Sequence, residues 1–133
     1  MPLEYTSRKV GPVFFVSLAG TVDLDAAREA YDRVLRACVD GGCTSLLLDA
    51  RGVDGELSTV ERFDFGKHVA ERNTTAERDL GLTLRVALVA RVPLADPGHF
   101  AAVVANNRGG KIKVAEQVED AFDWFGIAPL DGR

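Results

Sequence analysis

The chain has 133 residues, long enough for one compact core, and its 47% hydrophobic and 27% charged residues are typical of soluble globular proteins. Its net charge of −4 argues against a nucleic-acid binder or a protein of anionic membrane surfaces, since both need a basic face. No apolar run approaches about 18 residues, and the N-terminus lacks a basic segment followed by an apolar one. The sequence therefore predicts a cytoplasmic protein without membrane insertion.

The N-terminal third predicts a hairpin followed by a helix. Residues 3–8 alternate apolar and polar side chains like an edge strand, and Gly11-Pro12 marks a turn before the apolar run 13–18. We expect these segments to pair antiparallel, with the second strand buried on both faces. Asp23 then caps a helix that runs to about Asp40. Its apolar stripe consists of Leu24, Ala27, Tyr31, Val34, Leu35 and Cys38.

The middle of the chain predicts a strand and a second helix. The strand covers 45–50, and the helix runs from Ser58 to about Asn73. Ser58 and Glu61 have the spacing of a capping box. The side chains expected to face inward are Val60, Phe63, Gly66, the stem of Lys67, Val69 and Ala70. The polar stretch 74–82 predicts a loop or a frayed helix end.

The C-terminal third repeats the alternation of strand and helix. A strand is expected at 84–91, and Asp96-Pro97 predicts a helix start, because proline loses no hydrogen bond at the first helical position. Residues 111–114 predict an outer strand, and residues 127–133 a loose tail. The expected inner faces are Phe100, Val103, Val104 and Asn107 in one helix, and Val118, Ala121, Phe122 and Phe125 in the last.

The predicted order of elements is ββαβαβαβα. Strands separated by helices imply right-handed parallel crossovers. We therefore expect an α/β fold with a mixed, mostly parallel sheet of about five strands and about four helices. No repeat or linker divides the chain, so one domain should span residues 1–133.

Three segments carry a resemblance to a known family. Phe14–Asp23 resembles the second strand, and the glycine step after it, of the SpoIIAA-like members of the STAS superfamily. Leu46–Asp49 resembles the third strand of these proteins, and Val114–Phe125 resembles their closing strand and acidic helix. The superfamily takes its name from sulfate transporters and anti-sigma-factor antagonists. The similarity covers roughly residues 3–126 and rests mostly on core patterning. It implies the SpoIIAA-like fold and a regulatory, protein-binding role.

The resemblance also implies a phosphoacceptor at the start of the second helix. In the antagonist branch, a serine there is phosphorylated by a partner kinase within an Asp-Ser-Ser-Gly-like motif. Ser58 and Thr59 match the hydroxyl positions, whereas the acid lies at Glu56 and Val60 replaces the glycine. A phosphate at a helix N-terminus gains from free N–H groups and the helix dipole. The alternative is that Ser58 is simply the helix cap.

Other residues are candidates for a partner or ligand surface. Asp49 and Arg51 lie at the carboxyl end of a predicted central strand, where α/β proteins often bind ligands, although a local ion pair would also explain them. Glu56 and Ser58 follow in the next loop. Trp124 is offset from the apolar stripe of the last helix and is a candidate for a contact outside the core.

No residues assemble into a catalytic or metal-binding pattern, so we expect neither an enzyme nor a cofactor. His68 and His99 lack partners at metal-ligand spacing and are interpreted as surface or interfacial residues. Cys38 and Cys43 could form a redox pair or half of a metal site. Core thiols are the simpler interpretation for a cytosolic chain.

The sequence thus favours a non-enzymatic regulatory module that binds a regulatory protein or forms a homodimer. The alternative is a carrier or sensor that holds a small apolar or lipid-like ligand between its helices and its sheet. Carriage predicts an enclosed apolar cavity of about a few hundred cubic ångströms.

Overall fold

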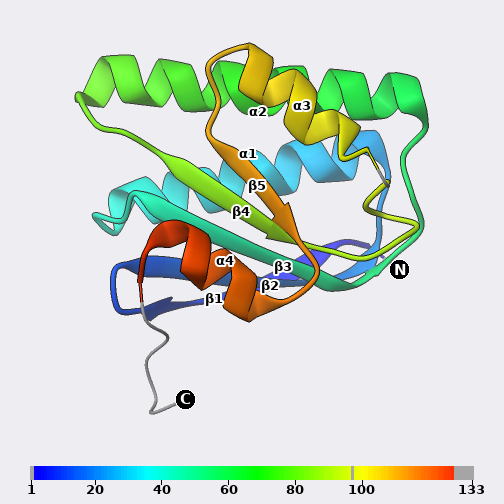
Figure 1. The fold of residues 1–133 in the computed structure, drawn as a ribbon, viewed down its shortest axis with the longest axis horizontal. Helices are drawn as coiled ribbons and strands as arrows, with labels where there is room; N and C mark the ends of the chain where they lie inside the picture. The colour runs from blue at the N-terminus through cyan, green and yellow to red at the C-terminus, as the bar shows by residue number, and fades with distance from the viewer. Residues whose placement is uncertain (1, 97, 128–133) are drawn as a thin grey trace.

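The strands and helices follow one another in the order that the hydrophobic pattern predicts (Figure 1). The computed structural model describes residues 2–96 and 98–127, which form five strands and four helices. The strands are β1 (Glu4–Val10), β2 (Val13–Thr21), β3 (Ser45–Asp54), β4 (Arg85–Val89) and β5 (Ile112–Ala115). The helices are α1 (Leu24–Asp40), α2 (Thr59–Leu80), α3 (Phe100–Asn107) and α4 (Val118–Phe125). The predicted fold class is confirmed.

The five strands form one sheet in the sequential order β1-β2-β3-β4-β5. β1 pairs antiparallel with β2, as predicted for the hairpin, and the other neighbours are parallel. Right-handed crossovers that always advance in one direction carry their helices to the same face. Accordingly, α1, α2 and α3 cover one face, and α4, which follows the last strand, covers the other (Figure 1).

Alternate residues of the central strands supply two core layers, one on each face of the sheet. The first layer joins β2, β3 and β4 to α1 and α2 and includes Phe14, Val16, Leu46, Leu48 and Val86. The second joins the same strands to α4 and includes Val13, Phe15, Leu47, Ala87 and Val89. Strand β2 is therefore buried on both faces over its first four residues, as its unbroken apolar run predicts. No helix of the described residues could cross a membrane.

Helix α2 is longer than predicted, because the polar stretch after Asn73 continues the helix to Leu80. Tertiary contacts favour the helix where composition does not. Asn73 is buried and accepts a hydrogen bond from the Tyr31 hydroxyl on α1. One turn later, the Glu77 carboxylate accepts the N–H of Leu84 at 2.8 Å. Gly81, in the left-handed conformation at φ 65°, then ends the helix.

Helix α3 begins later than predicted, at Phe100, while Pro97 lies outside the described residues. The Asp96 carboxylate accepts the N–H of Phe100 at 3.1 Å with both oxygens, so the acid caps the helix from four residues upstream. The predicted tail at 127–133 also lies outside the described residues, except for Ile127, which packs against the α4 layer.

Two predicted inner faces are partly wrong. In α2, Val60 is 70% exposed, and in α3 Val103 and Asn107 are exposed, whereas the buried residues of α3 are Ala102, Val104 and Ala105. Close packing of α2 on α3 explains the difference for α3. A Cβ on Gly66 would lie 2.4 Å from the carbonyl oxygen of Ala101 and 3.0 Å from the Cβ of Val104, so the face of α3 that carries these two residues meets α2.

Candidate functional site

The start of α2 is an exposed helix terminus with a complete capping box. The Ser58 hydroxyl accepts the N–H of Glu61 at 3.2 Å, and the Glu61 carboxylate accepts the N–H of Ser58 at 2.8 Å. Ser58, Thr59 and Val60 are all exposed. The cap is therefore present, and both hydroxyls remain accessible to a modifying enzyme. The role of either residue as a phosphoacceptor stays a prediction.

Strand β3 continues past the predicted end at residue 50 to Asp54, so Asp49 and Arg51 lie within the strand, at a bulge, and not at its end. The register against β2 shifts between Ser17 and Ala19, and on β3 it passes from Asp49 to Gly52. Arg51 folds back onto Asp49, and its backbone N–H, Nε and Nη2 donate to the carboxylate at 3.2, 2.8 and 2.7 Å. Burial acts to raise the pKa of Asp49, but the hydrogen bonds from Arg51 outweigh it, so the pKa lies below its usual value.

The structure divides the proposed partner surface between two regions. Asp49 is on the sheet face that α4 covers. Alongside the hydrogen bond to Asp49, the negative charge of Glu119, in the first turn of α4, helps to raise the pKa of the Arg51 guanidinium. Glu56 and Ser58 lie instead at the start of α2, which packs on the opposite face. The Glu56 carboxylate is 3.9 Å from Nη2 of Arg62. Asp49 and Arg51 therefore form an ion pair on the face that α4 covers, and Glu56 and Ser58 lie together at the start of α2.

Trp124 lies near the C-terminal end of α4, where Arg85 of β4 holds it. The Arg85 guanidinium donates to the carbonyl oxygens of Trp124 at 3.2 Å and Phe125 at 2.7 Å. It also lies 5.5 Å from the centroid of each of these two rings. Trp124 is half-buried and packs against the core between the sheet and α4. Sequence reasoning gave no role to Arg85, because nothing local links it to a helix about 40 residues later.

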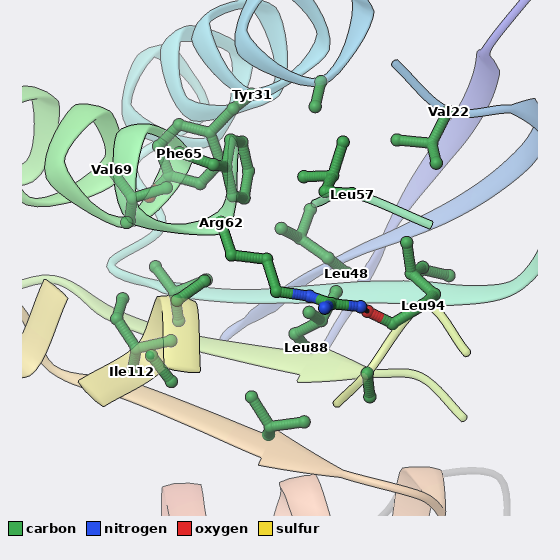
Figure 2. Close-up of a pocket in the computed structure, with 18 of the residues that line it drawn as sticks. Val22, Tyr31, Leu48, Leu57, Arg62, Phe65, Val69, Leu88, Leu94 and Ile112 are labelled. Carbon is green, nitrogen blue, oxygen red and sulfur yellow. Dashed lines mark hydrogen bonds between the residues drawn. The ribbon is translucent and has the colours of Figure 1, made fainter. Parts of the chain in front are cut away.

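An apolar cavity of about 130 Å³ lies between the sheet and α1, α2 and α3 (Figure 2). It is smaller than the few hundred cubic ångströms expected for ligand carriage. Figure 2 shows that both the sheet and the helices contribute to its wall. Leu48 and Leu88 come from the sheet, and Phe65 and Val69 come from α2. The residues between β4 and α3 complete the wall through Leu94, Ala95, Asp96 and His99.

Arg62 crosses this cavity from α2 to the segment that follows β4 (Figure 2). Its Nη2 donates to the carbonyl oxygens of Pro93 at 2.9 Å and Leu94 at 3.4 Å, and its Nε lies 3.5 Å from the Asp96 carboxylate. The side chain is 13% exposed. Arg62 was not among the predicted site residues, since in the sequence it is one charge on a helix rich in charges.

His68 and the two cysteines take structural positions, whereas His99 lines the cavity. The Nε2 atom of His68 lies 2.7 Å from Asp32, so this histidine joins α2 to α1. Both cysteines are buried, and burial raises the pKa of Cys38 to about 12. Within residues 2–96 and 98–127, no three His, Cys, Asp or Glu side chains are placed to hold a metal ion.

Comparison with known proteins establishes the fold. No family model and no curated protein sequence matches this chain. An anti-sigma factor antagonist from Mycobacterium paratuberculosis superimposes with a TM-score of 0.60 at 18% identity, over 92% of each chain. The anti-sigma factor antagonist SpoIIAA in its unphosphorylated form does so with a TM-score of 0.57 at 14% identity, over 94% of this chain and 99% of that one. The chain thus has the SpoIIAA-like fold that the sequence resemblance implies.

Proposed function

We propose that this chain is a non-enzymatic regulatory module of the cytoplasm that binds a partner protein through the start of α2. The observation that carries the proposal is the exposed capping box at Ser58, with Thr59 and Val60 beside it on the surface. The likeness in fold to two anti-sigma factor antagonists supports a role of this class. The proposed partner is a regulatory protein or a second copy of the chain.

Phosphorylation of Ser58 would change both the charge and the cap of this helix. The hydroxyl oxygen now accepts one N–H, from Glu61. A phosphate adds three acceptor oxygens and about −1.5 to −2 charges, which the N-terminal dipole of α2 favours. The Glu61 carboxylate lies next to it, bonded to the Ser58 N–H, and like charges repel. We therefore expect phosphorylation to replace the capping box with a phosphate cap and to move Glu61 outward.

Intact-mass analysis of the chain purified from its own host tests the phosphoswitch. The expected result is a species heavier by about one phosphate (~80 Da) that disappears in Ser58→Ala and persists in Thr59→Ala. Partner binding then needs a matched pair of variants. Ser58→Asp carries a charge and Ser58→Asn does not, while both side chains can cap the helix. An unmodified chain, together with equal partner binding by Ser58→Asp and Ser58→Asn, would refute the switch.

Sedimentation velocity distinguishes the two proposed partners. A second copy of the chain predicts a concentration-dependent dimer in the purified protein, and Val60→Asp should weaken it, because Val60 is 70% exposed at the proposed contact. A regulatory protein as the partner predicts a monomer at all concentrations. A dimer that Val60→Asp leaves unchanged would place the self-contact elsewhere.

A second candidate function, carriage or sensing of a small apolar ligand, rests on the apolar cavity beneath α1, α2 and α3, whose volume of about 130 Å³ restricts it to small ligands. Native mass spectrometry of the chain from its own host tests it. A bound small molecule that is lost on denaturation would support carriage. An empty chain under the same conditions would count against it.

A further inference from the structure

The wall of the cavity contains few groups that could bind a charge. Among the described residues that line it, the ionisable side chains are Arg62, Asp96, His99 and the phenol of Tyr31. The remaining lining consists of apolar side chains from the sheet, from α1, α2 and α3 and from the segments that connect them, together with Gly66. A ligand here would therefore be recognised mainly through burial of apolar surface.

Three of the four ionisable groups of the wall, Arg62, Asp96 and Tyr31, already make hydrogen bonds or ion pairs within the protein. Arg62 donates to the Pro93 and Leu94 carbonyl oxygens and lies 3.5 Å from the Asp96 carboxylate. Asp96 also accepts the N–H of Phe100. The hydroxyl of Tyr31, which also lines the cavity, donates to Asn73. Each of these contacts would have to break before the group could serve a ligand.

An anionic ligand would meet repulsion as well as competition. The Asp96 carboxylate lies 3.5 Å from Nε of Arg62, and the Glu56 carboxylate lies 3.9 Å from Nη2 of the same guanidinium. Two carboxylates thus share one cation. A further negative charge beside Arg62 would be repelled by both carboxylates. A neutral ligand disturbs none of these interactions.

The volume limits the size of the occupant. At about 130 Å³, the cavity is close to an engineered apolar cavity of about 150 Å³ that binds benzene. It is well below the roughly 300–1,000 Å³ of sites for drug-sized molecules. A single aromatic ring or a branched hydrocarbon of about six to eight carbon atoms fits this volume, whereas the acyl chain of a membrane lipid would extend beyond it.

We propose that the cavity between the sheet and α1, α2 and α3 binds a neutral apolar molecule of the size of a single aromatic ring. This proposal rests on the second candidate function and names the ligand class. Arg62 forms part of the wall by tying the segment Pro93–Asp96 to α2, and it contributes no charge to the ligand. That segment belongs to no strand or helix.

Titration of the full chain with fluorobenzene and with benzoate, followed by ¹⁹F and ¹H NMR, tests the proposal. The expected result is saturable binding of fluorobenzene in the millimolar range or tighter, with contacts to the methyl groups of Leu48 and Val69. Benzoate at the same concentration should not bind in the cavity. Benzoate binding there as tightly as fluorobenzene would overturn the neutral class but leave carriage standing. No binding of either probe would overturn the site and count against carriage in this cavity.

A variant that enlarges the cavity gives an independent readout. Leu48→Ala removes a wall residue, and we expect it to admit 1-fluoronaphthalene, which the wild-type cavity is too small to hold. The matched control is Leu80→Ala, the same substitution at a side chain that is 56% exposed and does not line the cavity. Equal binding of 1-fluoronaphthalene by both variants would overturn the assignment. If Leu48→Ala does not fold, the fluorobenzene titration of the wild-type chain still decides.

Discussion

Replacing Arg85 with methionine should loosen α4 from the sheet. Arg85→Met keeps an apolar stem but removes the guanidinium that bonds to the Trp124 and Phe125 carbonyl oxygens. A hydrogen bond from a charged donor contributes about 1.5–3 kcal/mol, and a cation–π contact at a partly exposed site about 0.5–1 kcal/mol. The bond to Phe125, at 2.7 Å, is the shorter of the two. Because these terms are not additive, we expect a loss of about 3 kcal/mol in the free energy of unfolding.

Urea and thermal unfolding, monitored by tryptophan fluorescence, measure this loss. For a domain of this size, about 3 kcal/mol lowers Tm by about 10 °C. Trp124 is the single tryptophan, so its emission reports on α4 directly and should shift to the red as the ring becomes more exposed. The control is Arg78→Met, because Arg78 is exposed and pairs with Asp79 at 3.5 Å. If both variants lose less than about 0.5 kcal/mol, the account of α4 docking is wrong.

Three further predictions concern the cap, the bulge and the α2–α3 contact. Ser58→Ala should lower the free energy of unfolding by about 1 kcal/mol, whereas Thr59→Ala should change it little. Urea titration measures both values, and equal losses in the two variants would contradict the capping role of Ser58. Asp49→Asn should flatten the acid dependence of stability. The folded-state pKa of Asp49 is depressed, so its contribution is complete above the unfolded pKa of about 4 and is lost as pH falls through the folded value. Unchanged acid titration curves would refute this. Gly66→Ala should destabilise the protein by about 1–3 kcal/mol, because the new Cβ would press on the Ala101 carbonyl, even though alanine has the better helix propensity. Thermal melts measure the effect. A stabilised variant would show that α2 and α3 can move apart at no cost.

Local signals in the sequence were sufficient for most of the fold. The period of the apolar residues located α1 and the central strands, and Asp23 and Ser58 marked two helix starts correctly. The signals failed where a distant contact decides the local structure. The end of α2 is polar, and it stays helical because Asn73 and Glu77 bond to residues on other elements. Such bonds have no trace in a window of neighbouring residues.

The candidate site shows the same limit more strongly. The exposed hydroxyls at the start of α2 were found because a capping box is a local pattern. The alternative of ligand carriage placed a cavity between the helices and the sheet, but its lining could not be assembled from the sequence, since the wall combines side chains from four strands and three helices. Arg62 and Arg85 reach 31 and 40 residues along the chain to their carbonyl acceptors. A guanidinium that satisfies a distant backbone resembles any surface arginine in the sequence, and only the folded chain distinguishes the two.

The sequential order of the strands has a consequence for how the chain forms during translation. Each strand pairs with the strand made just before it, so the sheet can grow in the direction of synthesis without inserting a strand between two others. The face that carries Leu47 and Val89 gains its cover only when α4 has left the ribosome. We therefore expect a stalled nascent chain that ends before α4 to expose this face and to recruit chaperones, whereas a chain extended past α4 should release them.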